Sequence, residues 1–364
     1  MNQEGAAKNR RLAEQIMAWY RQNKRPLPWR QTTDPYKIWL SEIILQQTRV
    51  QQGLPYYNRF VEHYPKVESL ANAPEQDILR LWQGLGYYSR ARNLHKCAQI
   101  IACNFGGIFP KTYVELMQLP GVGKYTAAAI ASFAYGEVVP VVDGNVYRVL
   151  ARLYAEPTDI SSSKAFSVFF NLAQNLIDQQ QPAEFNQAIM EFGAMQCTPK
   201  KPLCLYCPVK NYCEAYTLNM QQEFPVKLKK TKVTDRYLHY MVITDENGQV
   251  YMQQRTGNDI WKGLFQFPLL AYSQPEINRE ELPLQPQLES PLYKHQLSHQ
   301  SLYVRFYHYK VDSRKASEQL LPSTLANPAS KENNEGWYSI EQVENLPKPI
   351  LIQNYLKEAG FYLN

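Results

Sequence analysis

The chain has 364 residues, 45% of them hydrophobic, so it is long enough for two or three compact units with apolar cores. Lysine and arginine outnumber aspartate and glutamate by 39 to 33, a mild excess that permits a polyanionic partner without identifying one. No stretch approaches the roughly 20 apolar residues that span a bilayer, and the polar start MNQEGAAKNRRLAEQ lacks the apolar segment of a secretory signal. These properties exclude a membrane-embedded class and predict a soluble protein of a reducing compartment.

The first two thirds of the chain carry a helical pattern. Apolar residues recur at steps of three and four in LAEQIMAWY, IWLSEIILQQ, ILRLWQGL, ARNLHKCAQIIA, YTAAAIASFA and AFSVFFNLAQNLI. Prolines and glycines separate these runs, as in RPLPWR, LPGVG and QQPAEF. We therefore expect an all-α domain over residues 1–222.

The pattern changes toward the C-terminus. Residues 223–234 are polar and basic, which is typical of an interdomain linker. Strand-like alternation follows in YLHYMVIT, in VYMQQR after a DENG turn, and in SLYVRFYHYKV. The stretch IEQVENLPKPILIQNYLKEAG has a helical pattern. Residues 235–364 are therefore expected to form a smaller α/β domain.

A glycine hairpin, LPGVG at residues 119–123, precedes the alanine-rich helical run. Gly121 and Gly123 would let the backbone approach a ligand closely, and positive φ is open to both. Free N–H groups at the start of the following helix favour an anion, for which a DNA phosphate is the natural candidate. On LPGVG alone, a plain turn between helices competes with this interpretation.

An aspartate follows the hairpin by about twenty residues, in VVPVVDGNVYRVLARL. Asp143 is expected to cap the next helix, and capping alone would explain its presence. A carboxylate near a phosphate-binding hairpin also suits glycosidic cleavage, because it can stabilise or capture an oxocarbenium-like sugar. Asn145 could hold that carboxylate or a backbone phosphate.

Four of the six cysteines lie close together with the spacing C-x6-C-x2-C-x5-C. A structural zinc is one alternative, although four-thiolate zinc sites more often pair two C-x2-C units. A cubane iron–sulfur cluster accepts four thiolates at uneven spacing. Lysines at positions 200, 201 and 210 could make the loop basic toward DNA. The candidate ligands are Cys197, Cys204, Cys207 and Cys213.

These motifs resemble the helix–hairpin–helix DNA glycosylases. LPGVG, the alanine-rich helix and VDGN match that superfamily, and the cysteine spacing matches the [4Fe-4S] loop of its endonuclease III-like members. Together they cover most of residues 20–215. The resemblance implies a [4Fe-4S] cluster at residues 197–213, with a structural role because hydrolysing a glycosidic bond requires no electrons.

The residues after the hairpin separate two mechanisms within this superfamily. Lyase members carry a basic residue and then a Schiff-base lysine, whereas here Lys124 falls one residue early and Tyr125 takes the position of the nucleophile. A shift of one residue turns a helical side chain by about 100°. We therefore expect Lys124 to point to solvent or phosphate, and water to complete the reaction.

The segment WLSEIILQQT closely resembles the adenine glycosylases of the MutY type, in which the matching Glu42 is the general acid. Protonating a purine nitrogen makes the base a neutral leaving group, and a carboxyl in a dry pocket has its pKa raised for that task. The resemblance implies that Tyr125 and Asn145 hydrogen-bond around Asp143. The alternative for Glu42 is a solvent-facing position on an amphipathic helix.

The same resemblance implies an adenine pocket. RPLPWR would place Trp29 against an extruded base, with Arg25 and Arg30 near its edge or nearby phosphates. Leu45 and Gln187 fall at positions that match pocket contacts, and Gln187 stands where some relatives carry an acidic residue. Ordinary packing is the alternative for each of these residues.

A flipped base leaves a gap that wedge segments fill. Gln46, Gln47 and Thr48 match one such segment, and Tyr87 in GLGYYSRARNL matches another. Tyr87 would stack beside the orphaned base, a contact worth roughly 1–3 kcal/mol. A tyrosine in a helical turn is the alternative.

The C-terminal domain resembles the Nudix fold in WKGLFQFP, but the R-E-x-x-E-E signature that gathers Mg²⁺ for hydrolysis is missing. In MutY-type proteins a Phe-Ser-His loop of this domain reads 8-oxoguanine. The matching residues are Leu297, Ser298 and His299, with leucine in place of the aromatic; a leucine can still wedge between bases. A polar turn before a strand is the alternative.

The sequence thus predicts a multi-domain protein, with an all-α helix–hairpin–helix glycosylase core and a Nudix-like α/β domain. The implied activity is monofunctional removal of adenine opposite 8-oxoguanine or guanine in double-stranded DNA, by a cytoplasmic, nucleoid-associated monomer without a membrane partner. Three alternatives stay open: an endonuclease III-like pyrimidine glycosylase with lyase activity, a non-catalytic DNA-binding protein stapled by zinc, and, more remotely, a Nudix hydrolase.

Overall fold

The computed structural model describes residues 3–228, 233–270, 274–277, 279–312 and 335–361. The chain forms two compact units, one from Met1–Asn72 with Asn93–Lys230 and the other from Ala73–Arg92 with Thr231–Asn364. The second unit therefore takes in residues 73–92, which the helical pattern assigned to the first domain. This grouping depends on contacts between distant parts of the sequence, so no local pattern signals it.

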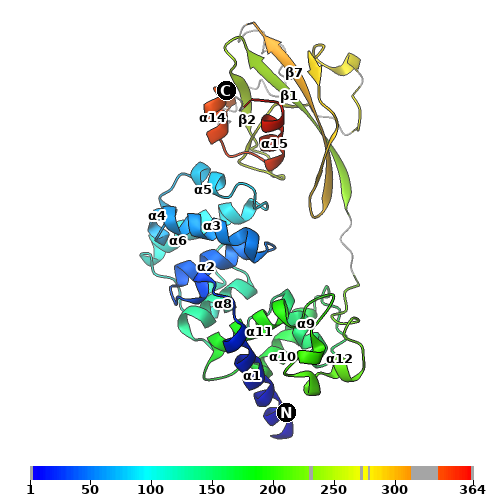
Figure 1. Cartoon of the computed structure of the whole chain (residues 1–364). Coiled ribbons are helices and arrows are strands. Elements are labelled where there is room, and N and C mark those ends of the chain that lie inside the picture. The colour runs from blue at the N-terminus through cyan, green and yellow to red at the C-terminus, as the bar shows by residue number, and fades with distance from the viewer. Residues whose placement is uncertain (1–2, 229–232, 271–273, 278, 313–334, 362–364) are drawn as a thin grey trace. The chain divides into compact units, whose positions relative to one another are not determined.

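The first unit is helical, in agreement with the sequence pattern (Figure 1). Its helices begin where Pro or a capping side chain precedes an apolar run: Asp34 accepts a hydrogen bond from the N–H of Tyr36, and Thr112 accepts one from Glu115. Within the described residues, no helix is long and apolar enough to cross a bilayer. The helices are α1 Gln3–Asn23, α2 Pro35–Leu45, α3 Val50–His63, α4 Val67–Ala71, α6 Ser89–Phe105, α7 Tyr113–Leu116, α8 Lys124–Tyr135, α9 Gly144–Leu153, α10 Ala165–Leu176, α11 Pro182–Met195 and α12 Glu214–Thr217. The first residues of α6, up to Arg92, are grouped with the second unit.

Two packed helices form the centre of this unit. In α8 every residue from Thr126 to Ser132 is buried, and its small alanine side chains allow α2 to pack closely against it. In α2 every residue from Ile38 to Ile44 is buried, including the carboxylate of Glu42. Helix α11 packs against both α1 and α9. A polar side chain on α2 is therefore enclosed by protein on several sides.

The predicted linker, residues 223–234, is ordered at its start. Phe224 is buried in the helical core and accepts a hydrogen bond from Arg152 Nε through its carbonyl. The carbonyl of Val226 accepts one from the N–H of Ile160 at 3.0 Å. Residues 229–232 lie outside the described residues. The first part of the segment thus packs on the helical unit instead of running free.

The second unit is built on a mixed sheet with strand order β3-β2-β1-β7-β5, with which β4, β6 and β8 also pair. The long strands β1 and β7 run parallel in register from Thr234↔Gln300 to Asp245↔Val311. The predicted strands in YLHYMVIT, VYMQQR and SLYVRFYHYKV are confirmed. The strands are β1 Thr234–Asp245, β2 Val250–Gln254, β3 Phe265–Gln266, β4 Leu269–Leu270, β5 Leu288–Glu289, β6 Tyr293–Gln296, β7 Gln300–Val311 and β8 Glu335–Tyr338.

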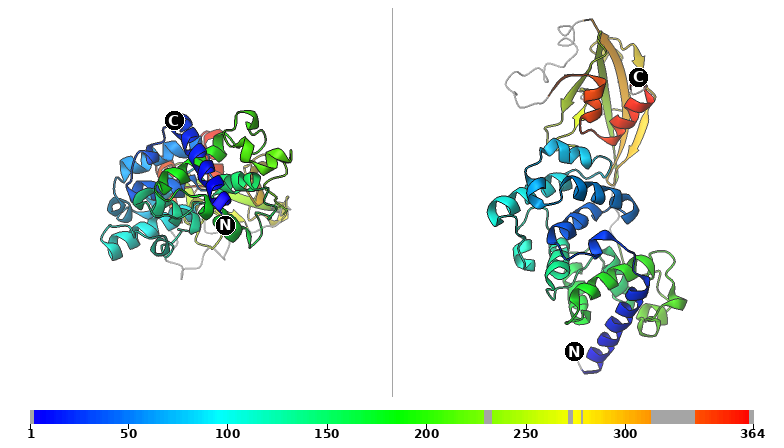
Figure 2. Two further views of the ribbon diagram at one scale, coloured as in Figure 1. Left: turned by 90° about the horizontal axis from the view of Figure 1, so that it is seen from below. Right: turned by 60° about the vertical axis from the view of Figure 1, so that its left-hand side comes forward.

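Helices cover one face of this sheet (Figures 1 and 2). The C-terminal helical stretch divides into α14 Ile340–Asn345 and α15 Ile350–Glu358, because Pro347 and Pro349 interrupt it. On α15, Tyr355 stacks on Phe306 of β7 with ring centroids 3.6 Å apart. The unit also contains α5 Glu75–Leu81. The expected combination of an all-α core with an α/β C-terminal domain is therefore confirmed.

Candidate active site

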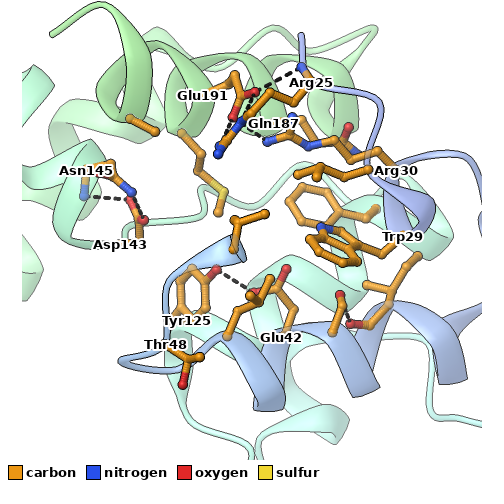
Figure 3. A pocket seen from close by; sticks show the side chains of 18 residues that line it. Arg25, Trp29, Arg30, Glu42, Thr48, Tyr125, Asp143, Asn145, Gln187 and Glu191 are labelled. Atoms are coloured by element: carbon orange, nitrogen blue, oxygen red, sulfur yellow. Dashed lines mark hydrogen bonds and ion pairs between the residues drawn. The ribbon is translucent and has the colours of Figure 1, made fainter. Parts of the chain in front are cut away.

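A cavity of the helical unit gathers ten of the residues that the sequence singled out (Figure 3). Its walls come from α2, α8, α11, the start of α9 and the 3₁₀ turn Pro28–Arg30. Charged and polar side chains converge here within the mostly apolar interior of the unit, which is typical of a catalytic pocket. The lining residues predicted from the sequence are Arg25, Trp29, Arg30, Glu42, Leu45, Thr48, Tyr125, Asp143, Asn145 and Gln187.

Glu42 is only 5% exposed, which excludes the solvent-facing alternative. Burial raises the pKa of Glu42 from 4.5 to about 7, although a hydrogen bond from the Tyr125 hydroxyl and the charge of Arg30 lower it. The neighbouring Asp143 carboxylate adds to the rise. Glu42 can therefore carry a proton near neutral pH and release it to a substrate, as a general acid must.

Asp143 is the N-cap of α9, as expected. Its carboxylate accepts hydrogen bonds from Asn145 N at 2.9 Å, Asn145 Nδ2 at 2.7 Å and Val146 N at 2.8 Å. Arg148 Nη2 donates to Asn145 Oδ1 at 2.8 Å and so holds the amide in place. Burial raises the pKa of Asp143, whereas these donors lower it. The carboxylate is thus fixed by its cap while it also borders the cavity.

Tyr125 differs from the expectation. The resemblance implied that both Tyr125 and Asn145 hydrogen-bond to Asp143, and Asn145 does so. The Tyr125 hydroxyl instead donates to Glu42 Oε2. Tyr125 is the second residue of α8, directly after the hairpin, and α8 packs against α2. Tyr125 therefore influences Glu42 directly, by a hydrogen bond that lowers the pKa of that carboxyl.

The opposite wall contains a carboxylate that the sequence analysis missed. Glu191 is fully buried and binds two arginines: it accepts from Arg25 N at 3.1 Å, Arg25 Nε at 2.7 Å, Arg25 Nη2 at 2.5 Å and Arg30 Nη2 at 2.8 Å. Burial raises the pKa of Glu191, but these hydrogen bonds outweigh it and lower the pKa to about 2. Glu191 follows Gln187 by four residues and so shares its helix face, which is the signal that could have found it.

Flat and polar groups complete this wall. Tyr20 donates to Gln187 Oε1 at 2.8 Å, and the Arg30 guanidinium lies over the Tyr20 ring at 5.7 Å. Trp29 is 7% exposed and packs edge-on against Tyr57, with centroids 5.1 Å apart. The cavity therefore offers an aromatic surface for a planar base and fixed polar groups for its edge.

The hairpin lies outside the cavity lining. Gly121 has φ +77°, so it uses the freedom of glycine, whereas Gly123 has φ −90° and does not. Positive φ was open to both glycines, and Gly121 alone of the two adopts it. Gly123 instead caps α8 without any side-chain hydrogen bond, which leaves N–H groups for a phosphate. Lys124 is exposed with its ammonium 4.3 Å from the Phe166 ring centroid, away from the cavity lining as expected.

Two of the predicted wedge glutamines also lie outside the cavity lining. Gln46 donates through Nε2 to Thr126 Oγ1 at 3.2 Å. Gln47 has left-handed backbone, with φ +56°, in the turn after α2. Thr48 follows and lines the cavity. The turn after α2 therefore has one residue, Thr48, in the cavity lining and one exposed residue, Gln47, with left-handed backbone.

Four other predicted residues meet in the second unit. Tyr87, with φ +50°, forms a hydrogen bond between its hydroxyl and Ser298 Oγ. Leu297, Ser298 and His299 form the turn between β6 and β7, closed by the Leu297 N–H to the Gln300 carbonyl at 2.8 Å. These four side chains line one cavity with Trp261 and His295. The structure thus brings the second wedge segment and the predicted lesion loop together.

The four cysteines of residues 197–213 line another small cavity in the helical unit, with apolar neighbours Val149, Leu153 and Phe192. Arg152 Nη1 donates to Cys197 Sγ at 3.4 Å and to the Thr198 carbonyl at 2.8 Å, which holds the loop. Among the described residues, no three Cys, His, Asp or Glu side chains are arranged to hold a single metal ion. All four thiols border one cavity, and thiolates are the ligands that iron–sulfur clusters take.

Comparison with known proteins places this fold. Residues 40–172 match the HhH-GPD superfamily of base excision DNA repair proteins, and residues 239–358 match the NUDIX domain family. A thermostable thymine-DNA glycosylase superposes with a TM-score of 0.54 at 30% identity, covering 58% of this chain and 98% of that one. An endonuclease III from a DNA complex shares the fold with a TM-score of 0.51 at 22% identity, covering 59% and 98%. The fold and cavity define a DNA glycosylase of the helix–hairpin–helix class.

Full-length relatives narrow the family. The adenine DNA glycosylase of Buchnera aphidicola subsp. Acyrthosiphon pisum is 30% identical over 355 residues, 95% of this chain and 98% of the relative. That of subsp. Baizongia pistaciae is 35% identical over 297 residues, 79% and 83% of the two chains. This chain belongs to the MutY-type adenine DNA glycosylase family. The mouse protein is 47% identical over 210 residues, 55% of this chain and 41% of the relative.

Proposed function

We propose that this DNA glycosylase hydrolyses the N-glycosidic bond of adenine mispaired with 8-oxoguanine or guanine, without lyase activity. The observation that carries the proposal is the pairing of Glu42, whose pKa is about 7, with Asp143 in one enclosed cavity. The relatives named as adenine DNA glycosylases support the choice of base. Glu42 would act as the proton donor because burial raises its pKa, and Asp143 would act as the carboxylate because three hydrogen bonds from Asn145 and Val146 stabilise its charged form.

The proposed reaction begins with a base turned out of the duplex and stacked against Trp29 in the cavity. Glu42 gives its proton to a ring nitrogen of the purine, the bond from C1′ to the base breaks, and adenine leaves as a neutral molecule. The Asp143 carboxylate stabilises or briefly captures the cationic sugar. Water then adds to C1′ and gives up a proton to a carboxylate of the site. Asn145 holds Asp143 in position, and Tyr125 holds Glu42.

The surface groups are proposed to bind DNA. Gly121 and Gly123 offer backbone N–H groups to a phosphate, and the turn of Gln46, Gln47 and Thr48 enters the gap left by the base. Tyr87 with Leu297, Ser298 and His299 contacts the base opposite adenine, where the hydroxyl and imidazole can read 8-oxoguanine. The enzyme is proposed to act as a monomer on the nucleoid, in the cytoplasm.

Cys197, Cys204, Cys207 and Cys213 are proposed to hold a [4Fe-4S] cluster. Their placement around one cavity with apolar neighbours supports a group that takes four thiolates. The cluster would order the loop from Cys197 to Cys213 and present its lysines to DNA, and none of the steps above passes through it.

The test is base release from duplexes with adenine opposite 8-oxoguanine, guanine or thymine. We expect free adenine from the first two and little from the third. Release of a pyrimidine instead would contradict the proposal. The lyase alternative is tested in the same reactions with borohydride, because the exposed Lys124 lies next to the position of the Schiff-base lysine. A strong covalent adduct between enzyme and DNA would support that alternative.

A further inference from the structure

Glu191 and Glu42 lie on opposite sides of the same cavity, and their carboxyl groups have different surroundings (Figure 3). Glu191 is fully buried and ionised between Arg25 and Arg30, whereas Glu42 is buried and forms no ion pair within the part of the chain that the structure describes. The proposed chemistry uses Glu42 and leaves Glu191 unexplained. An ion pair of this kind contributes little net stability compared with well-packed apolar residues, so its presence in the pocket points to another role.

The Arg30 guanidinium is bound on one side only. Its Nη2 donates to Glu191 at 2.8 Å, and its plane rests over the Tyr20 ring. Its Nη1 is buried and has no hydrogen-bond partner among the described residues. A buried donor without a partner is costly, so this nitrogen will bind any acceptor that comes within reach. The Glu42 carboxylate lines the same cavity.

We propose that Glu191 is a positioning residue that holds Arg30 away from Glu42 and thereby keeps the general acid protonated. The inference rests on the proposed function of Glu42. Once Glu191 is neutral, Arg30 has lost its carboxylate partner, and Glu42 is the acidic group that can replace it. An ion pair with an arginine lowers the pKa of a carboxyl by about 1–3 units. The acid would then be ionised at neutral pH and unable to protonate the base.

Other charged groups around Glu42 do not produce this effect. The remaining titratable or charged side chains that line the cavity are Arg25 before the 3₁₀ turn, Tyr125 on α8 and Asp143 before α9. Tyr125 already donates to Glu42, and the neighbouring Asp143 carboxylate raises the pKa of Glu42. Arg25 makes three hydrogen bonds to Glu191 and lies at the more exposed end of the pair. Arg30 is the cation whose charge already lowers the pKa of Glu42.

The experiment measures single-turnover adenine release against pH for the parent, Glu191→Gln, Glu191→Asp and the double variant Glu191→Gln with Arg30→Met. The parental rate should fall as pH rises through the pKa of Glu42. In Glu191→Gln the midpoint should move down by at least about one pH unit, with roughly a tenfold lower rate at pH 8 for each unit. Glu191→Asp keeps the charge and should keep the parental midpoint. Removing Arg30 as well should return the midpoint toward the parental value.

Two results would overturn the inference: an unchanged midpoint in Glu191→Gln, or a lowered midpoint that persists without Arg30. If Glu191→Gln has no cooperative thermal transition, Arg25→Met combined with Glu191→Gln removes one uncompensated arginine and should show the same lowered midpoint. Failure of the underlying function looks different. Glu42→Gln would then release adenine with the parental rate and pH profile, and the inference would fall with it.

Discussion

Glu42 and Glu191 line the same cavity, but the pKa of the first is raised and that of the second is lowered, because different groups surround each carboxyl. Glu42 has one hydroxyl donor and apolar walls, whereas Glu191 has two guanidinium groups. Both side chains are buried, so burial alone cannot distinguish them. The number of donors and the sign of the neighbouring charge do so, and they separate a proton donor from a fixed anion.

The raised pKa of Glu42 has a consequence for stability. Below about pH 4.5 the carboxyl is protonated in both the folded and the unfolded chain, so it carries no penalty. As pH rises to about 7, the folded protein loses stability relative to the unfolded chain, by up to about 3 kcal/mol. Glu42→Gln should therefore be more stable than the parent at pH 8 and similar to it at pH 4.5, in urea unfolding at each pH. An equal difference at both pH values would contradict this.

At Asp143 we expect the asparagine substitution to leave the stability of the fold almost unchanged, although the carboxylate is needed for activity. Asparagine caps helices about as well as aspartate, so Asp143→Asn should unfold within about 0.5 kcal/mol of the parent. Asp143→Ala removes the cap of α9 and should lose about 1 kcal/mol. Thermal unfolding of the two variants measures this. A loss in Asp143→Asn as large as in Asp143→Ala would mean that the charge itself is needed for the fold.

At the scale of elements, the local motifs were predicted and the contacts between elements were not. The N-cap at Asp143 and the positive φ of Gly121 follow from a few adjacent residues, so the sequence contains enough to find them. Glu191 binds arginines 166 and 161 positions away, and no local pattern encodes such pairs. Positive φ was open to Gly123 as well, but this residue caps α8 in extended backbone, so it does not use that freedom.

The crossing of α9 and α11 depends on Gly193. A Cβ there would lie 2.7 Å from Asn145 Cβ and 2.9 Å from its carbonyl oxygen. Gly193→Ala should therefore cost about 1–3 kcal/mol and, by displacing Asn145 from Asp143, slow excision by roughly a hundredfold. The matched control for stability is Gly144→Ala, where a Cβ meets nothing within 4 Å. Similar unfolding midpoints for the two variants would show that the helices can separate without strain.

At the scale of the whole molecule, length predicted two or three compact units, and the change of hydrophobic pattern along the chain predicted a helical domain and an α/β domain, both of which are present. Strand β7 largely alternates between buried and partly buried residues, and its Phe306 packs on Tyr355 of α15, whereas β1 and β2 contain runs of consecutive buried residues. The inclusion of Ala73–Arg92 in that unit was not predicted. Those residues form helices like their neighbours, so only long-range contacts reveal where they belong.

The cysteine loop gives a prediction about cofactor content. The purified protein should be brown, and Cys204→Ser should lose visible absorbance, thermal stability and DNA affinity. Cys103→Ser is the matched control because Cys103 is exposed on α6 and lies outside the loop. A colourless parent that contains one zinc per chain would contradict the assignment of the four thiolates.

The central claim, that Glu42 and Asp143 share the excision of adenine, is tested most directly by single-turnover kinetics. The substrate is a duplex with adenine opposite 8-oxoguanine, and the variants are Glu42→Gln and Asp143→Asn, with Glu62→Gln on the exposed side of α3 as the charge-matched control. Each of the first two should bind the duplex and release adenine at least about a hundredfold more slowly than the parent, whereas the control keeps the parental rate. Adenine release at the parental rate by both Glu42→Gln and Asp143→Asn would contradict the account.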